Sequence, residues 1–277
     1  NAITIDSNGL NYQGDDDTYT VEYTTDGQSV NIVYSGSTNG WIPIEDDTVT
    51  DAPYTGNSEG IFGFGTTGSY TGVTNLVSSS GVVASDVSAV GTARGQIAAC
   101  EYGTDKGIFG FGSTGSKTGV TNLVNSSGVV ASDVSGVGTS RDALGACGYG
   151  EDKGIFGFGE TSGNVGMTNL VSSSGVVASD VSAVGTARRA LTACDYGTDK
   201  GIFGFGYISA SAGMTNLVSN VGVVASDVTA VGTARYWLAA CGYGEDKGIF
   251  SFGSADATNL VSNVGVVASD VTQVGTG

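Results

Sequence analysis

Hydrophobic positions in this chain come in short runs separated by glycine and polar residues, a pattern typical of short β-strands rather than helices. The most regular run is the hexapeptide GIFGFG, which occurs five times, with serine for its middle glycine in the last copy. Each copy follows the previous one after 47 residues, and the copies begin at Gly60, Gly107, Gly154, Gly201 and Gly248. A fixed period of this length is typical of repeat architectures. The chain is therefore expected to contain five similar structural units.

One copy of the repeat predicts four short strands separated by turn sequences. In the second copy these are IAACEYG (97–103), GIFGFG (107–112), TNLV (121–124) and VVASDV (129–134). The first copy has TVTDAPY (48–54) in place of the first strand, with its final tyrosine matching Tyr102 after one inserted residue.

A single four-stranded meander cannot bury both of its faces, whereas five meanders closed into a ring can, and the ring also protects the sheet edges. The repeat therefore predicts an all-β fold, a five-bladed β-propeller of four-stranded blades. An open solenoid is the alternative, and the hairpin turns between strands favour the propeller. By strand alternation, Phe62 and Phe64 should point to one side and fill the gap between blades, while Gly63 and Gly65 admit the neighbouring blade on the other side.

Residues 1–47 do not follow the repeat and predict a small β module for assembly or anchoring, followed by the propeller at 48–277. Its expected strands are AITIDS, TYTVEYT, QSVNIVYS and NGWIPI, with a hairpin turn at TDG (25–27). We expect Tyr34 and Trp41 in its hydrophobic centre. A segment this short buries little surface alone, so it should pack on the repeats or on other chains.

Charge and composition exclude several functions. The chain has 27 acidic and 10 basic residues, a net charge of −17 and no histidine. An acidic surface repels phosphate backbones, so a nucleic-acid partner is not expected. No apolar run approaches the roughly 18 residues of a membrane span. The chain begins at Asn1 without a signal-peptide pattern, as expected of a processed product or a fragment.

Two features could suggest metal sites. The acidic clusters Asp15–Asp17 and Glu45–Asp47 fit solvated turns, and the alternative is a Ca²⁺ site, although no calcium-binding motif is present. No other cofactor is expected. The four cysteines recur once per repeat without CxxC spacing, so we expect small buried residues rather than disulfides or metal ligands. They are Cys100, Cys147, Cys194 and Cys241.

The aspartate of ASDV is followed eight residues later by an arginine in four of the copies. We expect a structural Asp–Arg pair that ties each blade to the next. The residues are Asp86, Arg94, Asp133, Arg141, Asp180, Arg188, Asp227 and Arg235.

The copies differ mainly in two places, the loop between the second and third strands and the stretch after GTAR or GTSR. In a four-stranded meander both places emerge at the same end, which we call the varied face. Variation on a rigid scaffold is typical of binding loops, and neutral drift is the alternative. The candidate ligand-binding residues are Tyr70, Lys117, Glu160, Arg189, Tyr207, Tyr236 and Trp237.

The tandem motif ACxYGxDKGIFGFG, with TNLVSxxGVVASDV and VGTAR after it, resembles repeats of bacteriophage tail-fibre and other virion proteins, as does VYSGSTNGWIPI (33–44). The glycine-rich second strand is loosely similar to kelch repeats. The layout of five repeats is similar to tachylectin-type lectin propellers, although their sequence motifs are absent. The resemblance implies a virion or extracellular location and partners that are other structural subunits or further copies of the chain.

The expected function is therefore a non-enzymatic structural or binding protein of a virion or appendage, whose propeller displays a face for host-surface or subunit contact. The alternative is a secreted carbohydrate-binding lectin with up to five equivalent sites. No catalytic residue is assigned, because the aspartates are mostly repeated fivefold and catalysis needs one asymmetric site.

Overall fold

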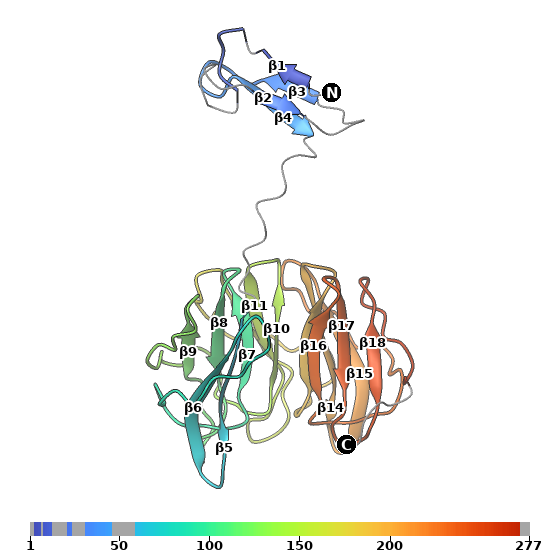
Figure 1. The fold of residues 1–277 in the computed structure, drawn as a ribbon. Helices are drawn as coiled ribbons and strands as arrows, with labels where there is room; N and C mark the ends of the chain where they lie inside the picture. The colour runs from blue at the N-terminus through green and yellow to red at the C-terminus, as the bar shows by residue number, and fades with distance from the viewer. Residues whose placement is uncertain (1–2, 7, 13–20, 24–30, 46–58, 272–277) are drawn as a thin grey trace. The chain divides into compact units, whose positions relative to one another are not determined.

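The computed structural model describes residues 3–6, 8–12, 21–23, 31–45 and 59–271. These residues form strands, turns and loops without a helix (Figure 1). The all-β prediction is therefore confirmed. Contacts divide the chain into two units, Asn1–Thr55 and Gly56–Gly277. The predicted boundary between residues 47 and 48 lies outside the described residues.

The first unit contains two small antiparallel pairs. Strand β1 (Ile3–Ile5) pairs with β2 (Val21–Tyr23), and β3 (Asn31–Tyr34) pairs with β4 (Trp41–Glu45). The rings of Tyr34 and Trp41 touch edge-on with centroids 5.5 Å apart. Tyr34 is nevertheless exposed, so its expected place in a hydrophobic centre is wrong, because two-stranded pairs bury little surface. The predicted TDG turn lies outside the described residues.

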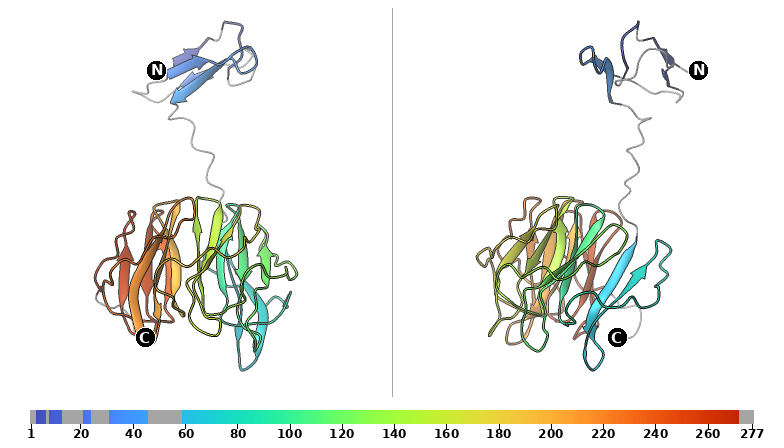
Figure 2. Two further views of the ribbon diagram at one scale, coloured as in Figure 1. Left: turned by 180° about the vertical axis from the view of Figure 1, so that it is seen from behind. Right: turned by 90° about the vertical axis from the view of Figure 1, so that its left-hand side faces the viewer.

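The second unit repeats a three-stranded antiparallel sheet, and Figure 2 shows the successive sheets side by side. Among residues 59–271, the first repeat contributes two of these strands, β5 (Gly60–Thr66) and β6 (Tyr70–Val77). The second to fifth repeats have three each: β7 (Ala98–Tyr102), β8 (Lys106–Gly110) and β9 (Thr121–Val124); β10 (Gly145–Tyr149), β11 (Lys153–Gly157) and β12 (Thr168–Val171); β13 (Thr192–Tyr196), β14 (Lys200–Tyr207) and β15 (Ser211–Val218); β16 (Ala239–Tyr243), β17 (Lys247–Ser251) and β18 (Thr258–Val261).

The fourth predicted strand of each repeat is a bridged segment rather than a regular strand. In the third repeat, Val177 and Val181 each form one isolated bridge to β12. Between these bridges the side-chain amide of Asn169 donates to the carbonyl of Ala178 at 3.0 Å and to Asp180 at 2.9 Å. The Asn169 side chain thus replaces part of the backbone hydrogen bonding that a regular strand pair would have.

In the second, third and fourth repeats, the two phenylalanines of the GIFGFG motif face opposite neighbours. Phe156 meets Phe111 of the preceding repeat, and Phe158 meets Phe203 of the following repeat. The expectation that both point the same way is wrong, because the second phenylalanine has a left-handed backbone, φ +63° at Phe158, which breaks the alternation. The expected close approach at glycine is found, since a β-carbon on Gly157 would lie 2.7 Å from Phe203.

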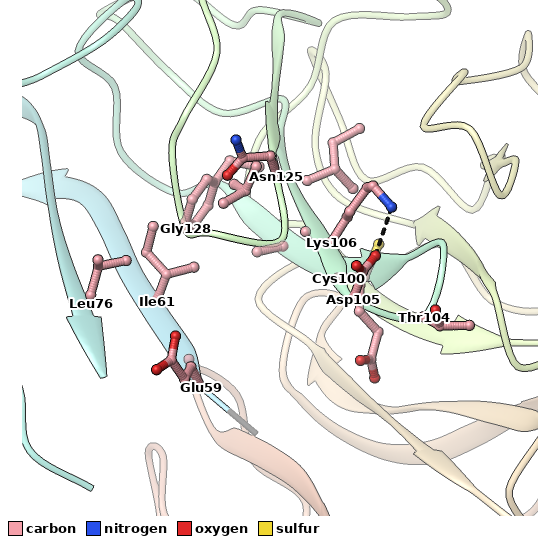
Figure 3. Close-up of a pocket in the computed structure, with 16 residues that line it drawn as sticks. Glu59, Ile61, Leu76, Cys100, Thr104, Asp105, Lys106, Asn125 and Gly128 are labelled. Carbon is pink, nitrogen blue, oxygen red and sulfur yellow. Dashed lines mark hydrogen bonds and ion pairs between the residues drawn. The ribbon is translucent and has the colours of Figure 1, made fainter. Parts of the chain in front are cut away.

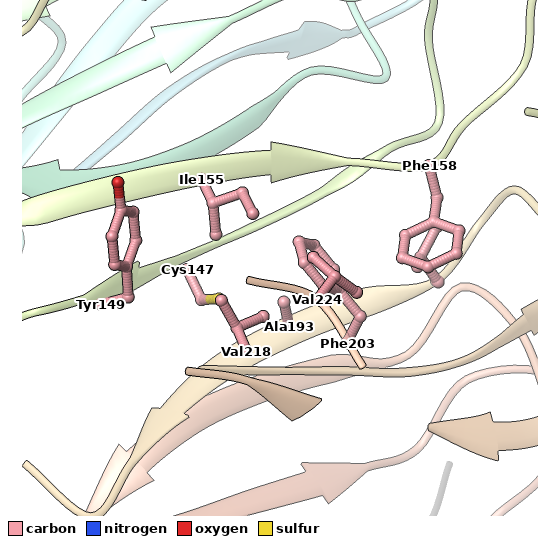
Figure 4. Close-up of a cluster of buried hydrophobic side chains, with 9 residues drawn as sticks. Cys147, Tyr149, Ile155, Phe158, Ala193, Phe203, Val218 and Val224 are labelled. Carbon is pink, nitrogen blue, oxygen red and sulfur yellow. The ribbon is translucent and has the colours of Figure 1, made fainter. Parts of the chain in front are cut away.

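The core lies between successive sheets. Figure 4 shows one such cluster, in which Tyr149, Ile155 and Phe158 pack with Phe203 and Val218 of the next repeat. Three of the four cysteines contribute to these clusters. Cys147 and Cys194 are buried as predicted, whereas Cys100 is half-buried and Cys241 is exposed. All four are free thiols. Burial raises the pKa of Cys100 and Cys194 to about 12, so these thiols stay protonated.

A fully buried arginine crosses each of the four described interfaces. The guanidinium of Arg188 lies 4.2 Å from the ring centre of Phe158 in the third repeat. It donates to the carbonyl of Phe205 at 2.7 Å and to the Asn216 side chain at 2.7 Å, both in the fourth repeat. Burial lowers the pKa of Arg188 to about 10.

Aspartate and arginine do meet between successive repeats, as expected, but the aspartate beside each arginine is that of the following copy rather than the one eight residues before it. Arg188 lies 3.9 Å from Asp227, and Arg141 lies 3.9 Å from Asp180. The shorter contacts to Asp227 come from Thr186, whose backbone N–H donates at 3.0 Å and whose hydroxyl donates at 2.5 Å.

These aspartates remain charged in the folded protein. Burial alone raises the pKa of Asp227, but the hydrogen bonds from Thr186 and Asn216 and the charge of Arg188 outweigh it, so the pKa falls below its usual value. The same threonine–aspartate contact recurs at four interfaces, between Thr92 and Asp133, Thr139 and Asp180, Thr186 and Asp227, and Thr233 and Asp270.

The outer faces of the first and fifth repeats are open. Phe62 is 63% exposed and Phe252 is 41% exposed, whereas the equivalent Phe156 and Phe158 are fully buried. Among residues 59–271, ring contacts join each repeat to the next but do not join the fifth to the first.

Candidate functional site

One residue from each of four repeats meets at one end of the second unit. Gln96, Ala143, Ala190 and Trp237 occupy equivalent positions before the first strand of their repeats, and all have left-handed backbones with φ between +52° and +53°. Ala143 donates its N–H to the carbonyl of Gln96 at 3.0 Å, Ala190 to that of Ala143 at 2.8 Å, and Trp237 to that of Ala190 at 2.9 Å. A chain of backbone hydrogen bonds therefore joins the second to fifth repeats at this end.

A cavity of about 410 Å³ lies at this end and is called the shared pocket below. This volume is within the range of small-molecule sites. Besides Gln96, Ala143, Ala190 and Trp237, it is lined by Glu160, Arg189, Tyr207 and Tyr236.

Aromatic side chains form one part of the shared pocket. The rings of Tyr207 and Tyr236 meet edge-on with centroids 5.2 Å apart, and the guanidinium of Arg189 lies 5.3 Å from the centre of Tyr207. Trp237 is 53% exposed and stands in the pocket rather than in the core. An exposed indole of this kind offers an apolar face and an N–H donor to a ligand.

Paired charges form the other part. Arg189 forms an ion pair with Glu160. Lys117 places its Nζ 3.5 Å from Glu160 and 3.5 Å from Asp142, and donates to the carbonyl of Thr161. Burial raises the pKa of Asp142, and the charge of Lys117 opposes that rise. In the lining of the shared pocket the charges of Glu160 and Arg189 offset one another, so the pocket does not select strongly for ligand charge.

The sequence-predicted candidates mostly gather here. Glu160, Arg189, Tyr207, Tyr236 and Trp237 line the shared pocket, and Lys117 contacts Glu160 from outside it. The two varied stretches are also paired directly, by bridges between Arg189 and Tyr207 and between Asp142 and Glu160. Tyr70 lies apart, with its hydroxyl 3.3 Å from Ser113 between the first two repeats.

Sequence reasoning missed four residues of the site. Asp142 could have been found, because it occupies the same varied position as Arg189 and Tyr236. Gln96 could also have been found, because it lies in the varied stretch at the position equivalent to Trp237, whereas Ala143 and Ala190 contribute through backbone position and their side chains carry no chemical signal.

A second cavity of about 360 Å³ is lined by residues from the first strands of several repeats and from the turns after them. Its lining includes Glu101, Asp195 and Lys247. Burial and the charge of Asp195 both raise the pKa of Glu101. Within the described parts of the chain, no group of three or more acidic or cysteine side chains could hold a metal ion. The cluster Asp15–Asp17, the predicted alternative calcium site, lies outside them, as do Asp46 and Asp47.

The comparisons with known proteins leave the chain without an assigned family. No protein-family model matches it, and no curated protein matches it either. In the described residues there is no helix long and apolar enough to cross a membrane.

Proposed function

We propose that this chain is a non-enzymatic binding protein of a virion or extracellular appendage, and that the shared pocket is its recognition site for a host surface or a neighbouring subunit. One observation carries the proposal: several of the positions at which otherwise near-identical repeats differ meet in a single pocket. Glu160, Arg189, Tyr236 and Trp237 come from three different interstrand stretches and converge there.

Neutral drift would vary exposed loops without regard to their position. The end of each repeat opposite the varied face carries the TDK or EDK turns. It is nearly constant although it is also exposed. Selection for different side chains at one end explains this asymmetry, because loops on a rigid scaffold carry binding specificity.

We also propose that the five repeats are the blades of a five-bladed propeller. Pockets shared by several repeats support a circular arrangement around one axis. The open faces support its closure, because Phe252 and Cys241 of the fifth repeat match residues that contact the next repeat elsewhere, and Phe62 and Gly60 of the first match their partners. Closing this fifth interface would bury both apolar faces.

A surface carbohydrate is a second candidate for what the pocket recognises. The half-exposed Trp237 beside the Arg189–Glu160 ion pair would offer an apolar platform with both donors and acceptors, which suits a neutral, hydroxyl-rich ring. Because the pocket is built from different residues of several repeats, this reading has one site per chain rather than up to five equivalent sites.

Replacing Trp237 with alanine should weaken binding by about tenfold or more, the effect of removing a central aromatic anchor. The measurement compares wild-type and Trp237→Ala chains on a printed glycan panel and on bacterial envelopes. Glu151→Ala is the control, because Glu151 is an exposed residue of a turn between first and second strands. Equal binding by wild type and Trp237→Ala, or an equal loss in both variants, would contradict the assignment of the pocket.

A further inference from the structure

Lys117 differs from the other four lysines of the chain in what it contacts. Each of those four forms an ion pair with the aspartate immediately before it in the same turn, as Lys106 does with Asp105 at 2.6 Å (Figure 3). Lys117 has no acidic residue in its own loop between β8 and β9, and its side chain reaches from the second repeat into the third. This lysine therefore joins stretches in which the repeats differ.

The partners of Lys117 are two acids that lie directly opposite one another. The backbone N–H of Asp142 donates to the carbonyl of Glu160 at 3.1 Å, and that of Glu160 donates to the carbonyl of Asp142 at 2.9 Å. Like charges in directly opposed positions are destabilising. The equivalent pair of the fourth repeat, Arg189 with Tyr207, opposes no like charges. The third repeat thus needs a cation at a place where the fourth does not.

Burial makes this cation most important for Asp142. The residue is 6% exposed, and within the described structure its Oδ1 accepts no hydrogen bond and lies 3.5 Å from the Nζ of Lys117. The charged groups that face it are Lys117, Glu160 and Arg189. Burial raises the pKa of Asp142 and the charge of Glu160 adds to that rise, whereas the two basic groups oppose it. A buried carboxylate without a nearby cation takes up a proton instead of staying charged.

Glu160 connects this acid pair to the shared pocket. Its Oε1 lies 3.5 Å from the Nζ of Lys117, and its Oε2 forms the ion pair with Arg189. Glu160 and Arg189 line the pocket, and Lys117 stands outside it. The ammonium of Lys117 also donates to the carbonyl of Thr161, which helps to hold it between the two carboxylates.

We propose that Lys117 is a positioning residue of the shared pocket: its ammonium holds the two carboxylates together and thereby keeps Glu160 and Arg189 in place in the lining. The proposal rests on the proposed function only in taking this pocket as the recognition site. A surface ion pair without such a role would contribute little to stability and would leave the pH dependence of the pocket unchanged.

Replacing Lys117 with methionine keeps the length of the side chain and removes its charge. The pKa of Asp142 should then rise further, because an opposite charge within about 4–6 Å lowers a carboxyl pKa by roughly 1–3 pH units. Above this pKa the two carboxylates repel each other, so Glu160 moves relative to Arg189. Below it the protonated Asp142 can donate to Glu160 and restore the wild-type arrangement.

The test is a pH titration of the emission of Trp237, which lines the same pocket, in a Trp41→Phe background that leaves it as the only tryptophan. The midpoint in Lys117→Met should lie at least about one pH unit above that of the background chain. Lys117→Arg should restore most of the background profile because it keeps the charge. Asp142→Asn should remove the transition with and without Lys117→Met. Lys106→Met is the matched control, because it removes the same charge from a lysine paired within its own turn.

Circular dichroism at each pH establishes that every variant is folded before its emission is compared. A Lys117→Met chain that titrates as the background chain does would overturn the proposal. A shift of equal size in Lys106→Met, or one that persists without the Asp142 carboxyl, would overturn it as well. The titration needs no ligand, so the positioning role and the proposed recognition function can each fail while the other holds.

Discussion

Replacing Arg188 with methionine should lower the free energy of unfolding by about 3–5 kcal/mol, the cost of removing one member of a buried charged network. The guanidinium is fully buried, stacks on Phe158 and donates to Phe205 and Asn216 across the interface. Methionine has the apolar length of the side chain but leaves these acceptors without their donor. Equilibrium unfolding in urea, followed by tryptophan fluorescence and circular dichroism, measures the change.

Lysine should not rescue the effect. Its ammonium is not planar and cannot stack on Phe158 while donating in the two directions that Arg188 uses. Arg188→Lys is therefore expected to lose more than half of the stability lost in Arg188→Met.

Arg189 provides a control at the adjacent position. Its side chain is 37% exposed and pairs with Glu160 at the shared pocket, so Arg189→Met should change stability by less than about 1 kcal/mol. A large loss at Arg189 and a small one at Arg188 would contradict the role of the buried arginine in joining the repeats.

Replacing Phe203 with alanine should cost about 3–5 kcal/mol, because the change combines lost burial with a cavity between two sheets. Phe203 is fully buried, its ring meets that of Phe158 at 5.2 Å, and its edge lies against Gly157. Neither neighbour can fill the space easily, since Phe158 is held by its own backbone and by Arg188.

Val176 is a suitable comparison for this variant, because it belongs to the third repeat, on the other side of that interface, and is 65% exposed. Val176→Ala should change the free energy of unfolding by less than about 0.5 kcal/mol. A cost for Phe203→Ala no larger than that of Val176→Ala would show that the sheet interfaces are not the core of the molecule.

Sequence could predict the strands of the repeats because turn residues and short apolar runs act locally. It could not predict the direction of the second phenylalanine, because that direction depends on a left-handed backbone at Phe158. Such a backbone is usually signalled by a glycine, and the motif has phenylalanine at this position. The partner of each arginine was also beyond the spacing argument. Spacing relates residues within one copy, whereas Arg188 reaches across an interface to Asp227 of the next copy.

The candidate site was predictable to the extent that it is made of differences between copies. Arg189, Tyr236 and Trp237 stand out when the repeats are compared with one another. The convergence of these positions in one pocket was not predictable, because it depends on the hydrogen bonds that join Ala143, Ala190 and their equivalents in successive repeats. Those residues act through their backbones and leave little trace in the sequence.

The proposed closure of the five repeats makes a prediction for Cys241, the cysteine of the last repeat, which is exposed in the described structure. Elsewhere each cysteine lies against the first glycine of the next GIFGFG motif, with β-carbon distances of 2.5 Å for Gly154 and Gly201 and 2.6 Å for Gly248. In a closed ring Cys241 would have the same relation to Gly60. The two positions therefore report directly on the fifth interface.

The most direct test is oxidation of a Gly60→Cys variant, followed by peptide mapping and non-reducing electrophoresis, with the same variant in a Cys241→Ser background as control. A closed propeller predicts an intrachain disulfide between the introduced thiol and Cys241 in the monomer, absent from the control. Free thiols at both positions, or a disulfide that forms only between chains, would contradict the claim that the five repeats close around one axis.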